Sequence, residues 1–370
     1  MRIALFHSTL PSPTRKVGGV EVVVHQLANH LVHAGHAVTV FSLSPQPDDA
    51  AYDHEHLFPN RPALLSHPVL RWVVLPALLN RISFRDFDVV HFHGDDWFYL
   101  RRSVPSVRTV HGSALEEARS ADTWKRQVVQ RLLYPLERLA VRLATVGLAI
   151  GPNTATLYPN TTLVNNGVDL ERFRPGPKTS QPSILFVGTW TGRKRGSFLF
   201  DTFRRAVLPD VPDATLVMVS DHVSEACADH PNVEYRARPS DAELAALYRA
   251  AWVFAFPSTY EGFGLPYVEA MASGTAVLSS PNDGARHVLA DGATGCIAED
   301  PDFGPALVDL LQSPARREAL EARGLDRAQT FAWPAVVSAH EAHYAAALSG
   351  NSAATPSSPS SDVHHETARL

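Results

Sequence analysis

Short aliphatic runs alternate with longer segments of helical periodicity in the first half of the chain. Residues 19–35 carry apolar side chains on one face of a helix that ends at Gly35, namely Val20, Val23, Val24, Leu27 and Leu31. The aliphatic runs, which are typical of buried strands, are residues 2–7, 36–42, 88–93 and 107–112. Because a strand, a helix and a strand in succession pair in parallel, this half predicts a doubly wound parallel sheet.

The same alternation restarts after a polar, proline-rich stretch at residues 170–182. A helix is predicted near 196–206, and the predicted strands cover 182–190, 214–220, 251–258 and 275–280. The sequence therefore predicts an α/β fold with two doubly wound, Rossmann-like domains. Ligands of such sheets bind beyond the carboxyl ends of the strands, so two facing domains imply a cleft between them.

The predicted organisation has five parts. They are an N-terminal domain (1–169), a linker (170–182), a C-terminal domain (183–330), a closing helix that begins near Pro334 (331–348) and a tail rich in serine and proline (349–370). The tail has almost no large apolar residue, so we expect it to be disordered. A solvated tail also explains His364 and His365 better than a metal site does.

Composition narrows the class of protein. With 370 residues, of which 45% are hydrophobic and 19% charged, the chain has enough apolar material for two cores. The net charge of −5 gives no overall positive field, which argues against a nucleic-acid partner. The two cysteines, Cys227 and Cys296, make neither a disulfide framework nor a cysteine-rich metal site, and they indicate a reducing compartment.

Few segments could meet a membrane. Residues 2–7 have the pattern of a strand rather than of a secretory leader, and no apolar run reaches the roughly 20 residues of a membrane-spanning helix. Residues 62–80 come nearest but are interrupted by Arg71 and Pro76. We expect a cytoplasmic protein in which 62–80 forms a buried or groove-lining helix, with peripheral membrane contact through 62–80 as the alternative.

The strongest local signal for chemistry lies at residues 256–274. A predicted strand ends at Phe256, a loop with Gly262 and Gly264 follows, and Pro266 marks the start of a helix. Glycines allow backbone and ligand to approach closely, and the helix end directs unpaired N–H groups and its positive dipole at the loop. This combination suits an anion such as a diphosphate.

Two carboxylates flank this loop. Glu261 lies on the loop and Glu269 is expected in the first turn of the helix. Each can accept two hydrogen bonds and therefore suits a pair of sugar hydroxyls. The alternative is that Glu269 only complements the helix dipole and that Glu261 is solvated.

A basic cluster follows the first strand of the second domain, in the segment 188–196. Arg193, Lys194 and Arg195 lie together before a helix, in a chain with very few lysines. Fixed cations stabilise the negative charge that develops on a departing diphosphate. A solvated basic turn is the simpler alternative.

Histidines end two of the predicted strands. His111 faces the expected cleft, although a lone histidine is more often structural. His91 and His93 point to the same side of their strand but lack convincing thiolate or carboxylate partners, so we expect no zinc there.

Together these motifs resemble family 4 of the glycosyltransferases, whose fold is GT-B. The donor-site motif of that family, two glutamates separated by seven residues, corresponds to EGFGLPYVE (261–269). The similarity covers nearly the whole chain and includes Gly18 and Gly19 before a helix, NNGVDLERF (165–173), FVG (186–188), GARHVLADGATGCI (284–297) and a closing helix introduced by FAW (331–333). The order and spacing of these motifs make a chance match implausible.

The resemblance implies a retaining enzyme that moves a sugar from a nucleotide-diphosphate sugar to an acceptor glycan, lipid or small molecule. It implies that the closing helix returns to the acceptor-side first domain. Glu261 would bind hydroxyls of the donor sugar near the N–H groups of Phe263 and Gly264, the N–H of Leu265 would meet phosphate, and Glu269 would hold the ribose. His111 would touch the donor sugar.

The expected site residues fall into three groups. Those assigned to catalysis are Glu261, Lys194, Arg195 and His111; those assigned to donor and nucleotide binding are Glu269, Gly262, Phe263, Gly264, Leu265, Arg193 and Gly188; those assigned to the acceptor side are Gly18, Gly19, His91 and His93. No metal or other cofactor is expected, because the helix end and the basic cluster supply the cationic charge. Asp86 and Asp88 match the metal-nucleotide signature of the other glycosyltransferase fold only by coincidence.

One departure from the family concerns Thr189, which stands where many relatives have an arginine directly after the strand glycine. One phosphate contact is therefore missing or is supplied by the basic cluster.

Three other classes of protein are alternatives to a glycosyltransferase. An epimerase or phosphorylase-like enzyme of the same fold would consume donor without an acceptor, and a non-catalytic binding protein would bind donor without turnover. A nicotinamide oxidoreductase is disfavoured because no G-x-G-x-x-G follows a strand.

Overall fold

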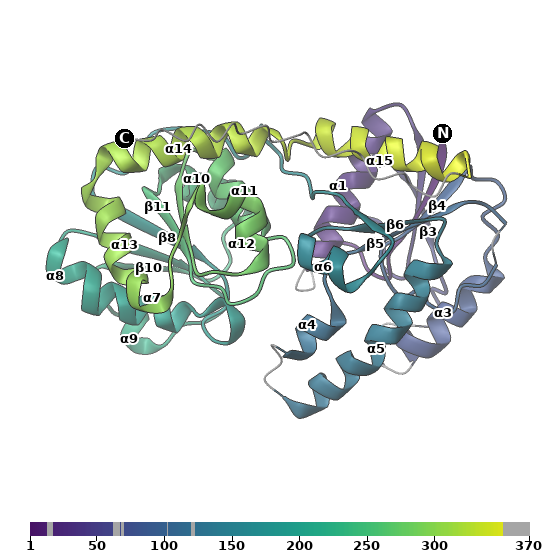
Figure 1. Cartoon of the computed structure of the whole chain (residues 1–370), viewed down its shortest axis with the longest axis horizontal. Helices are drawn as coiled ribbons and strands as arrows, with labels where there is room; N and C mark the ends of the chain where they lie inside the picture. The colour runs from purple at the N-terminus through teal and green to yellow at the C-terminus, as the bar shows by residue number, and fades with distance from the viewer. Residues whose placement is uncertain (13–17, 62–66, 68–69, 102, 120–122, 351–370) are drawn as a thin grey trace, which may run out of the picture.

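The computed structural model describes residues 1–12, 18–61, 67, 70–101, 103–119 and 123–350. Two parallel sheets with helices packed around them lie side by side along the long axis of the molecule (Figure 1). The predicted α/β fold of two doubly wound units is confirmed.

The first sheet has seven parallel strands in the order β3-β2-β1-β4-β5-β6-β7. Their bounds are β1 (Arg2–Phe6), β2 (Ala37–Ser42), β3 (Asp53–His56), β4 (Val89–Phe92), β5 (Ser106–Val110), β6 (Val146–Ala149) and β7 (Thr161–Leu163). The central strands β4 and β5 are buried along their whole length, including the polar His91 and Arg108 that interrupt their apolar residues.

The helices of the first unit are α1 (Gly19–His33), the π-helical turn η1 (Leu70–Val74), α3 (Leu75–Leu78), the 3-10 turn η2 (Leu79–Arg81), α4 (Ala114–Arg119), α5 (Trp124–Leu143) and α6 (Pro152–Leu157). The predicted apolar face of α1 is buried, except that Val20 is half-buried. Within 62–80, residues 62–66 and 68–69 lie outside the described residues. Leu75 and Leu79 are fully buried beside Phe84, so the described part of this segment contributes to the core.

The second sheet has six parallel strands in the order β10-β9-β8-β11-β12-β13. They are β8 (Ser183–Val187), β9 (Thr215–Val219), β10 (Val233–Arg236), β11 (Val253–Phe256), β12 (Ala276–Ser279) and β13 (Cys296–Ile297). The helices and turns around it are η3 (Gly192–Lys194), α7 (Gly196–Thr202), η4 (Phe203–Val207), α8 (Leu208–Asp210), α9 (Glu225–Ala228), α10 (Asp241–Ala250), α11 (Leu265–Ala272), α12 (Asp283–Val288), η5 (Ala290–Gly292), α13 (Asp300–Gln312) and α14 (Pro314–Gln329).

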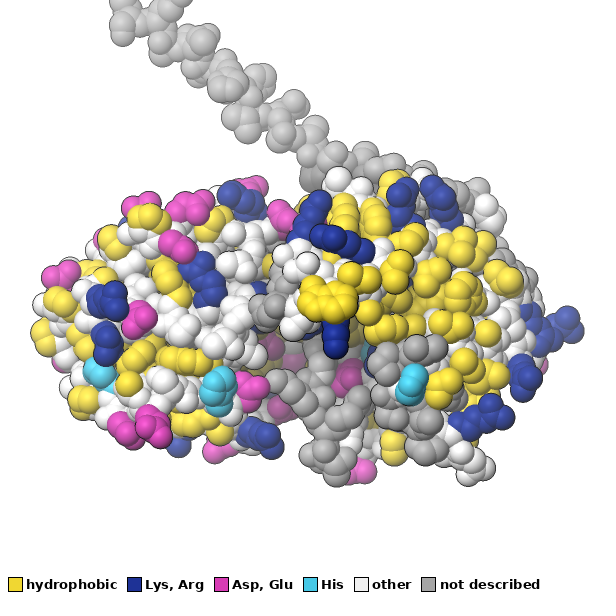
Figure 2. Space-filling view, turned by 90° about the horizontal axis from the view of Figure 1, so that it is seen from below, with side chains coloured by type: hydrophobic (Ala, Val, Ile, Leu, Met, Phe, Trp, Pro, Cys, Tyr) yellow, Lys and Arg dark blue, Asp and Glu magenta, His cyan; other side chains and the backbone are white. Residues whose placement is uncertain are grey.

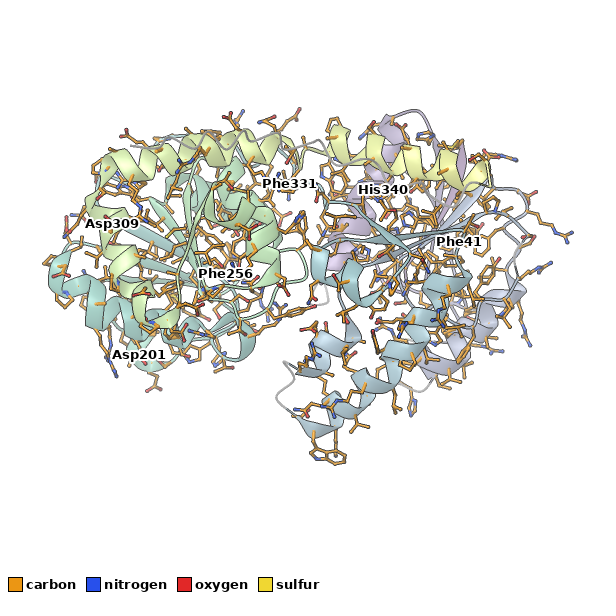
Figure 3. All side chains as sticks on the ribbon, in the orientation of Figure 1. Phe41, Asp201, Phe256, Asp309, Phe331 and His340 are labelled. Carbon is orange, nitrogen blue, oxygen red and sulfur yellow. The ribbon has the colours of Figure 1, made fainter. Side chains whose placement is uncertain are left out.

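The last described helix, α15 (Trp333–Leu348), crosses back and packs against α1 and β4–β6 of the first unit (Figure 1). At the crossing point the N–H of Val168 donates to the carbonyl of Phe331 over 2.8 Å. Figure 3 shows Phe331 between the two units and His340 further along α15, on the first unit. The expected return of the closing helix is therefore observed. Of the tail, Ser349 and Gly350 follow α15, and residues 351–370 lie outside the described residues.

Removing α15 is expected to unfold the protein. The helix buries its side chains on the first unit, namely Trp333, Val336, Val337, His340, Tyr344 and Ala347. Loss of one large core side chain costs about 2–5 kcal/mol, and several together exceed the roughly 5–15 kcal/mol of a typical domain. A chain that ends at Thr330 should therefore be insoluble or molten by circular dichroism, whereas one that ends at Gly350 should melt like the full chain. A folded, active chain ending at Thr330 would refute this role of α15.

Candidate functional site

The loop between β11 and α11 carries the glycines singled out in the sequence. Gly264 adopts φ +94°, a left-handed conformation that favours glycine, and a Cβ there would lie 2.4 Å from the Tyr267 ring. Gly264 directly precedes α11, which has Pro266 at its second position. In the first turn of α11, Pro266 has no N–H and the Tyr267 N–H donates to the Gly264 carbonyl over 3.0 Å, so the Leu265 N–H is the one that this helix start offers to a ligand. This is the junction of a glycine loop and a helix at which the sequence predicts an anion site.

Glu261 lies at the centre of a charged cluster on this loop. Its carboxylate accepts from Lys194 Nζ, from the Ser258 hydroxyl over 2.6 Å, and pairs with Arg193 Nη1 over 2.9 Å. Burial opposes ionisation of this 5%-exposed residue, yet Lys194 and Arg193 beside it hold the pKa of the Glu261 carboxyl below its usual value. Glu261 is therefore an ionised, buried carboxylate rather than a solvated one.

Lys194 reaches Glu261 from η3, just beyond the carboxyl end of β8. Gly188 lets it do so, because a Cβ at Gly188 would lie 3.1 Å from the Lys194 Cβ and 2.8 Å from Phe186. The ammonium also lies 4.4 Å from the centre of the Phe256 ring. Burial lowers the pKa of Lys194 to about 8, with Glu261 opposing the shift. The amine is thus mainly charged at neutral pH, in a site shielded from water.

The three basic residues of the cluster point to different places. Arg193 lines the cleft and donates to the Tyr260 carbonyl over 2.6 Å. Arg195, in contrast, pairs with Asp300 over 2.7 Å and stacks 4.0 Å from the centre of the Phe198 ring. Arg195 therefore turns away from Glu261, although the sequence grouped it with Lys194 as catalytic.

Glu269 lies in the second turn of α11, not the first as expected. Burial raises the pKa of its carboxyl to about 7, with the neighbouring Tyr248 hydroxyl opposing the shift. Tyr248 itself is fully buried on α10. A half-buried carboxyl whose pKa is near 7 can change its charge at little cost when a ligand binds.

The donor-side loop touches the first unit through backbone. A Cβ at Gly151 would lie 2.4 Å from the carbonyl oxygen of Gly262, and a Cβ at Gly262 would lie 3.1 Å from that of His111. Tyr260 also approaches Gly112 with its hydroxyl. Gly262 thus serves close packing between the two units, and this packing brings His111 next to the loop that carries Glu261.

A group of buried histidines lies behind His111. The rings of His93 and His111 share a hydrogen bond of 2.8 Å, and the ring centres of His91 and His93 are 4.0 Å apart. Burial, together with the neighbouring positive groups, holds the pKa values of all three well below the usual value, so they are neutral at pH 7. His91 is bound to the Tyr344 hydroxyl of α15 and to Thr109 and is fully buried, so it does not line an open acceptor surface as expected.

Two cavities flank this constellation. One, of about 320 Å³, lies between the units and is lined by Glu117, Arg126, Thr189, Thr191, Gly192, Arg193 and Tyr260. Thr189 and Arg193 thus line the same cavity. The other, of about 300 Å³, opens in the first unit beside His111 and His93, and Trp72, Trp97, Arg108 and Glu137 are among its lining residues.

The remaining expected residues lie at the starts of two helices and in the core. Gly18 and Gly19 are exposed at the start of α1, where the Gly18 N–H donates to Glu21. Phe263 is buried against Phe331, and Leu265 is half-buried at the first position of α11. Ser258, Tyr248 and Tyr260 were not predicted. Ser258 and Tyr260 could have been noticed beside Glu261, whereas only the fold brings Tyr248 to Glu269.

Two family models match the chain. Residues 17–172 match the model described as "Glycosyltransferase Family 4", and residues 181–313 match "Glycosyl transferases group 1". The chain belongs to the family 4 glycosyltransferases. It is an enzyme of the transferase class, and its fold is GT-B.

Two relatives of this glycosyltransferase have names that specify inositol compounds. The phosphatidyl-myo-inositol mannosyltransferase of Mycolicibacterium smegmatis is 29% identical over 86% of this chain and 88% of its own length. The D-inositol 3-phosphate glycosyltransferase of Kribbella flavida is 29% identical over 90% of this chain and 91% of its own.

Solved structures share the fold at lower identity. Sucrose-phosphate synthase from Thermosynechococcus elongatus has a TM-score of 0.74 and 20% identity, covering 94% of this chain and 99% of the other. Anabaena Alr3699/HepE, solved in complex with UDP and glucose, has a TM-score of 0.68 and 15% identity, and the match covers 93% of this chain and 99% of the other.

Proposed function

We propose that the enzyme transfers a sugar from a nucleoside diphosphate sugar, held by the second unit, to an acceptor bound beside His111. The observation that carries this proposal is the convergence of Lys194, Glu261 and the start of α11. They come from loops beyond the carboxyl ends of β8 and β11, where ligands of parallel sheets bind. The UDP-glucose complex of Anabaena Alr3699/HepE, a protein with the same fold, supports a donor of this class.

The proposed role of each residue follows from its charge. Lys194, Arg193 and the Leu265 N–H at the start of α11 neutralise the charge that builds on the diphosphate as the sugar C–O bond breaks. Glu261 accepts hydrogen bonds from hydroxyls of the donor sugar and also fixes the position of Lys194. Glu269, once ionised, accepts hydrogen bonds from the two ribose hydroxyls.

The acceptor would attack from the same face as the leaving diphosphate, which gives retention. The bond between the sugar carbon and the diphosphate oxygen breaks with its electron pair on the diphosphate, the acceptor oxygen bonds to the carbon, and the acceptor proton passes to the diphosphate oxygen. No covalent enzyme intermediate is needed in this scheme. The cavity beside His111 is the proposed place for the acceptor.

The first acceptors to try follow from the relatives, whose names specify phosphatidyl-myo-inositol and D-inositol 3-phosphate. We also propose a cytoplasmic enzyme that meets a membrane at its periphery when its acceptor is a lipid. Among the described residues no helix is long and apolar enough to cross a membrane.

Transfer is expected to survive chelation of metals. Lys194, Arg193 and the end of α11 supply the positive charge that a divalent ion would otherwise provide, and the described residues contain no group of three or more potential metal ligands. We therefore expect rates of nucleoside diphosphate release with 5 mM EDTA and with 5 mM magnesium or manganese to agree within about twofold. Activity that vanishes in EDTA and returns with a divalent metal would overturn the metal-free proposal.

A further inference from the structure

Exposed apolar side chains are distributed unevenly over the molecule. Among the described residues, no exposed large apolar side chain lies between Leu163 and Leu348. Four of the nine that are exposed belong to one helix, α5, which projects from the lower side of the first unit (Figure 1). They are Trp124 (70% exposed), Val128 (46%), Leu132 (66%) and Leu139 (39%).

These residues form one stripe along α5. Together with exposed Pro135 they are spaced by four, four, three and four residues, which places them on one face of the helix. The opposite face points inward, where Gln130, Leu133 and Glu137 line the cavity beside His111. Figure 2, which is seen from below, shows hydrophobic side chains gathered over this unit with lysines and arginines at their edge.

The charges on α5 show which kind of partner the stripe fits. The helix carries five basic residues, Lys125, Arg126, Arg131, Arg138 and Arg142, in a chain whose net charge is −5. Its one acid, Glu137, is turned into the cavity, and Lys125, Arg131 and Arg142 are exposed beside the stripe. An apolar stripe between cations is typical of helices that lie in the interface of anionic bilayers, whereas cores of protein interfaces are depleted in lysine.

We propose that the outer face of α5 docks the enzyme on an anionic lipid surface. Trp124, Val128, Leu132 and Leu139 enter the headgroup region, and Lys125, Arg131 and Arg142 contact anionic headgroups. Since the inner face of the same helix lines the cavity beside His111, docking brings that cavity close to the bilayer. The proposal names the surface for peripheral membrane contact, in place of residues 62–80, and it does not require that the enzyme transfer a sugar.

Flotation with vesicles tests the proposal. The full chain should bind vesicles of phosphatidylcholine with 30% phosphatidylglycerol, and binding should fall about tenfold or more on pure phosphatidylcholine or when salt rises from 50 to 500 mM. The double variants Trp124→Ala/Leu132→Ala and Lys125→Glu/Arg131→Glu should each lose about tenfold or more in partitioning. Leu348→Ala, which removes a 45%-exposed leucine from α15, should bind like wild type.

The controls separate this proposal from the proposed function. All variants should keep their melting temperature and their affinity for soluble nucleotide sugar, because the changed side chains are exposed and lie outside the donor site. Absence of wild-type binding to anionic vesicles, or full binding by the Trp124→Ala/Leu132→Ala variant, would overturn docking while leaving the transferase function untouched. A dimer in light scattering that this variant converts to a monomer would instead assign the stripe to a second copy of the chain.

Discussion

Replacing Lys194 with methionine is expected to lower turnover by about 10²–10³-fold while the protein stays folded. The charge of Lys194 acts on a diphosphate whose negative charge grows only as the sugar leaves, so its loss raises the barrier more than it weakens donor binding. Methionine keeps most of the apolar stem and loses only the ammonium that lies over the Phe256 ring, and Arg193 still pairs with Glu261. Turnover is measured as release of nucleoside diphosphate at saturating donor.

Arg195→Met is the matched control. Arg195 is the next basic residue in the chain, but it pairs with Asp300 and stacks on Phe198, so we expect its turnover to remain within about threefold of wild type. Lys194→Arg should recover part of the lost rate because it restores a positive charge. Equal losses in the Lys194 and Arg195 variants, or wild-type turnover in Lys194→Met, would remove Lys194 from its proposed role.

Replacing Glu261 and replacing Glu269 are expected to impair different steps, turnover in the first case and donor binding in the second. Glu261→Ala should abolish most turnover yet leave affinity for the free nucleoside diphosphate almost intact, because it removes a contact to the sugar and releases Lys194 and Arg193. Glu269→Ala should weaken the free diphosphate and the intact donor together, by about 1.5–3 kcal/mol for lost charge-assisted hydrogen bonds. Calorimetry with both ligands measures the split, and Glu318→Ala, on the exposed side of α14, is the control.

A pH series adds a second signature of Glu269. Burial raises the pKa of this carboxyl to about 7, and only the ionised form accepts both ribose hydroxyls. Donor affinity should therefore fall about tenfold for each pH unit below 7 and level off between pH 7 and about 8, above which Lys194 loses its charge. The intact donor has no group that titrates there. Glu269→Gln should bind weakly at every pH with no such slope. Equal loss of diphosphate affinity in Glu261→Ala and Glu269→Ala would show that the pair shapes the loop instead.

Much of the fold was predictable because buried parallel strands are apolar on both faces. The runs at 2–7 and 88–93 correspond to β1 and β4, and the spacing of apolar residues predicted α1. Two strands at the sheet edges were not predicted. β3 has the sequence DHEH and β13 has only two residues, so neither has an apolar pattern that could be recognised. β6 was missed because its four residues follow the apolar positions of α5 without a break.

The site was predictable where one motif contains its members. Glu261, Gly264 and Glu269 belong to a single loop and helix, so their proximity followed from the chain itself. The partners of the basic cluster could not be predicted from the chain. Arg195 pairs with Asp300, which lies 105 residues away, and no neighbouring residue in the sequence distinguishes Arg195 from Lys194. His91 was misplaced for the same reason, since its contact with Tyr344 depends on the return of α15.

The most direct test of a nucleotide-sugar site between Lys194 and Glu269 is a thermal-shift panel of UDP-, GDP- and ADP-sugars in EDTA. A ligand at about 100 times its Kd adds roughly 2.7 kcal/mol to the folded state, which should raise the melting temperature of the second unit by several degrees. We predict that donors with one of these bases produce this shift in the wild type and a much smaller one in Glu269→Ala. If no nucleotide sugar stabilises the wild-type protein at millimolar concentration, or if Glu269→Ala responds as strongly, the donor-site assignment is wrong.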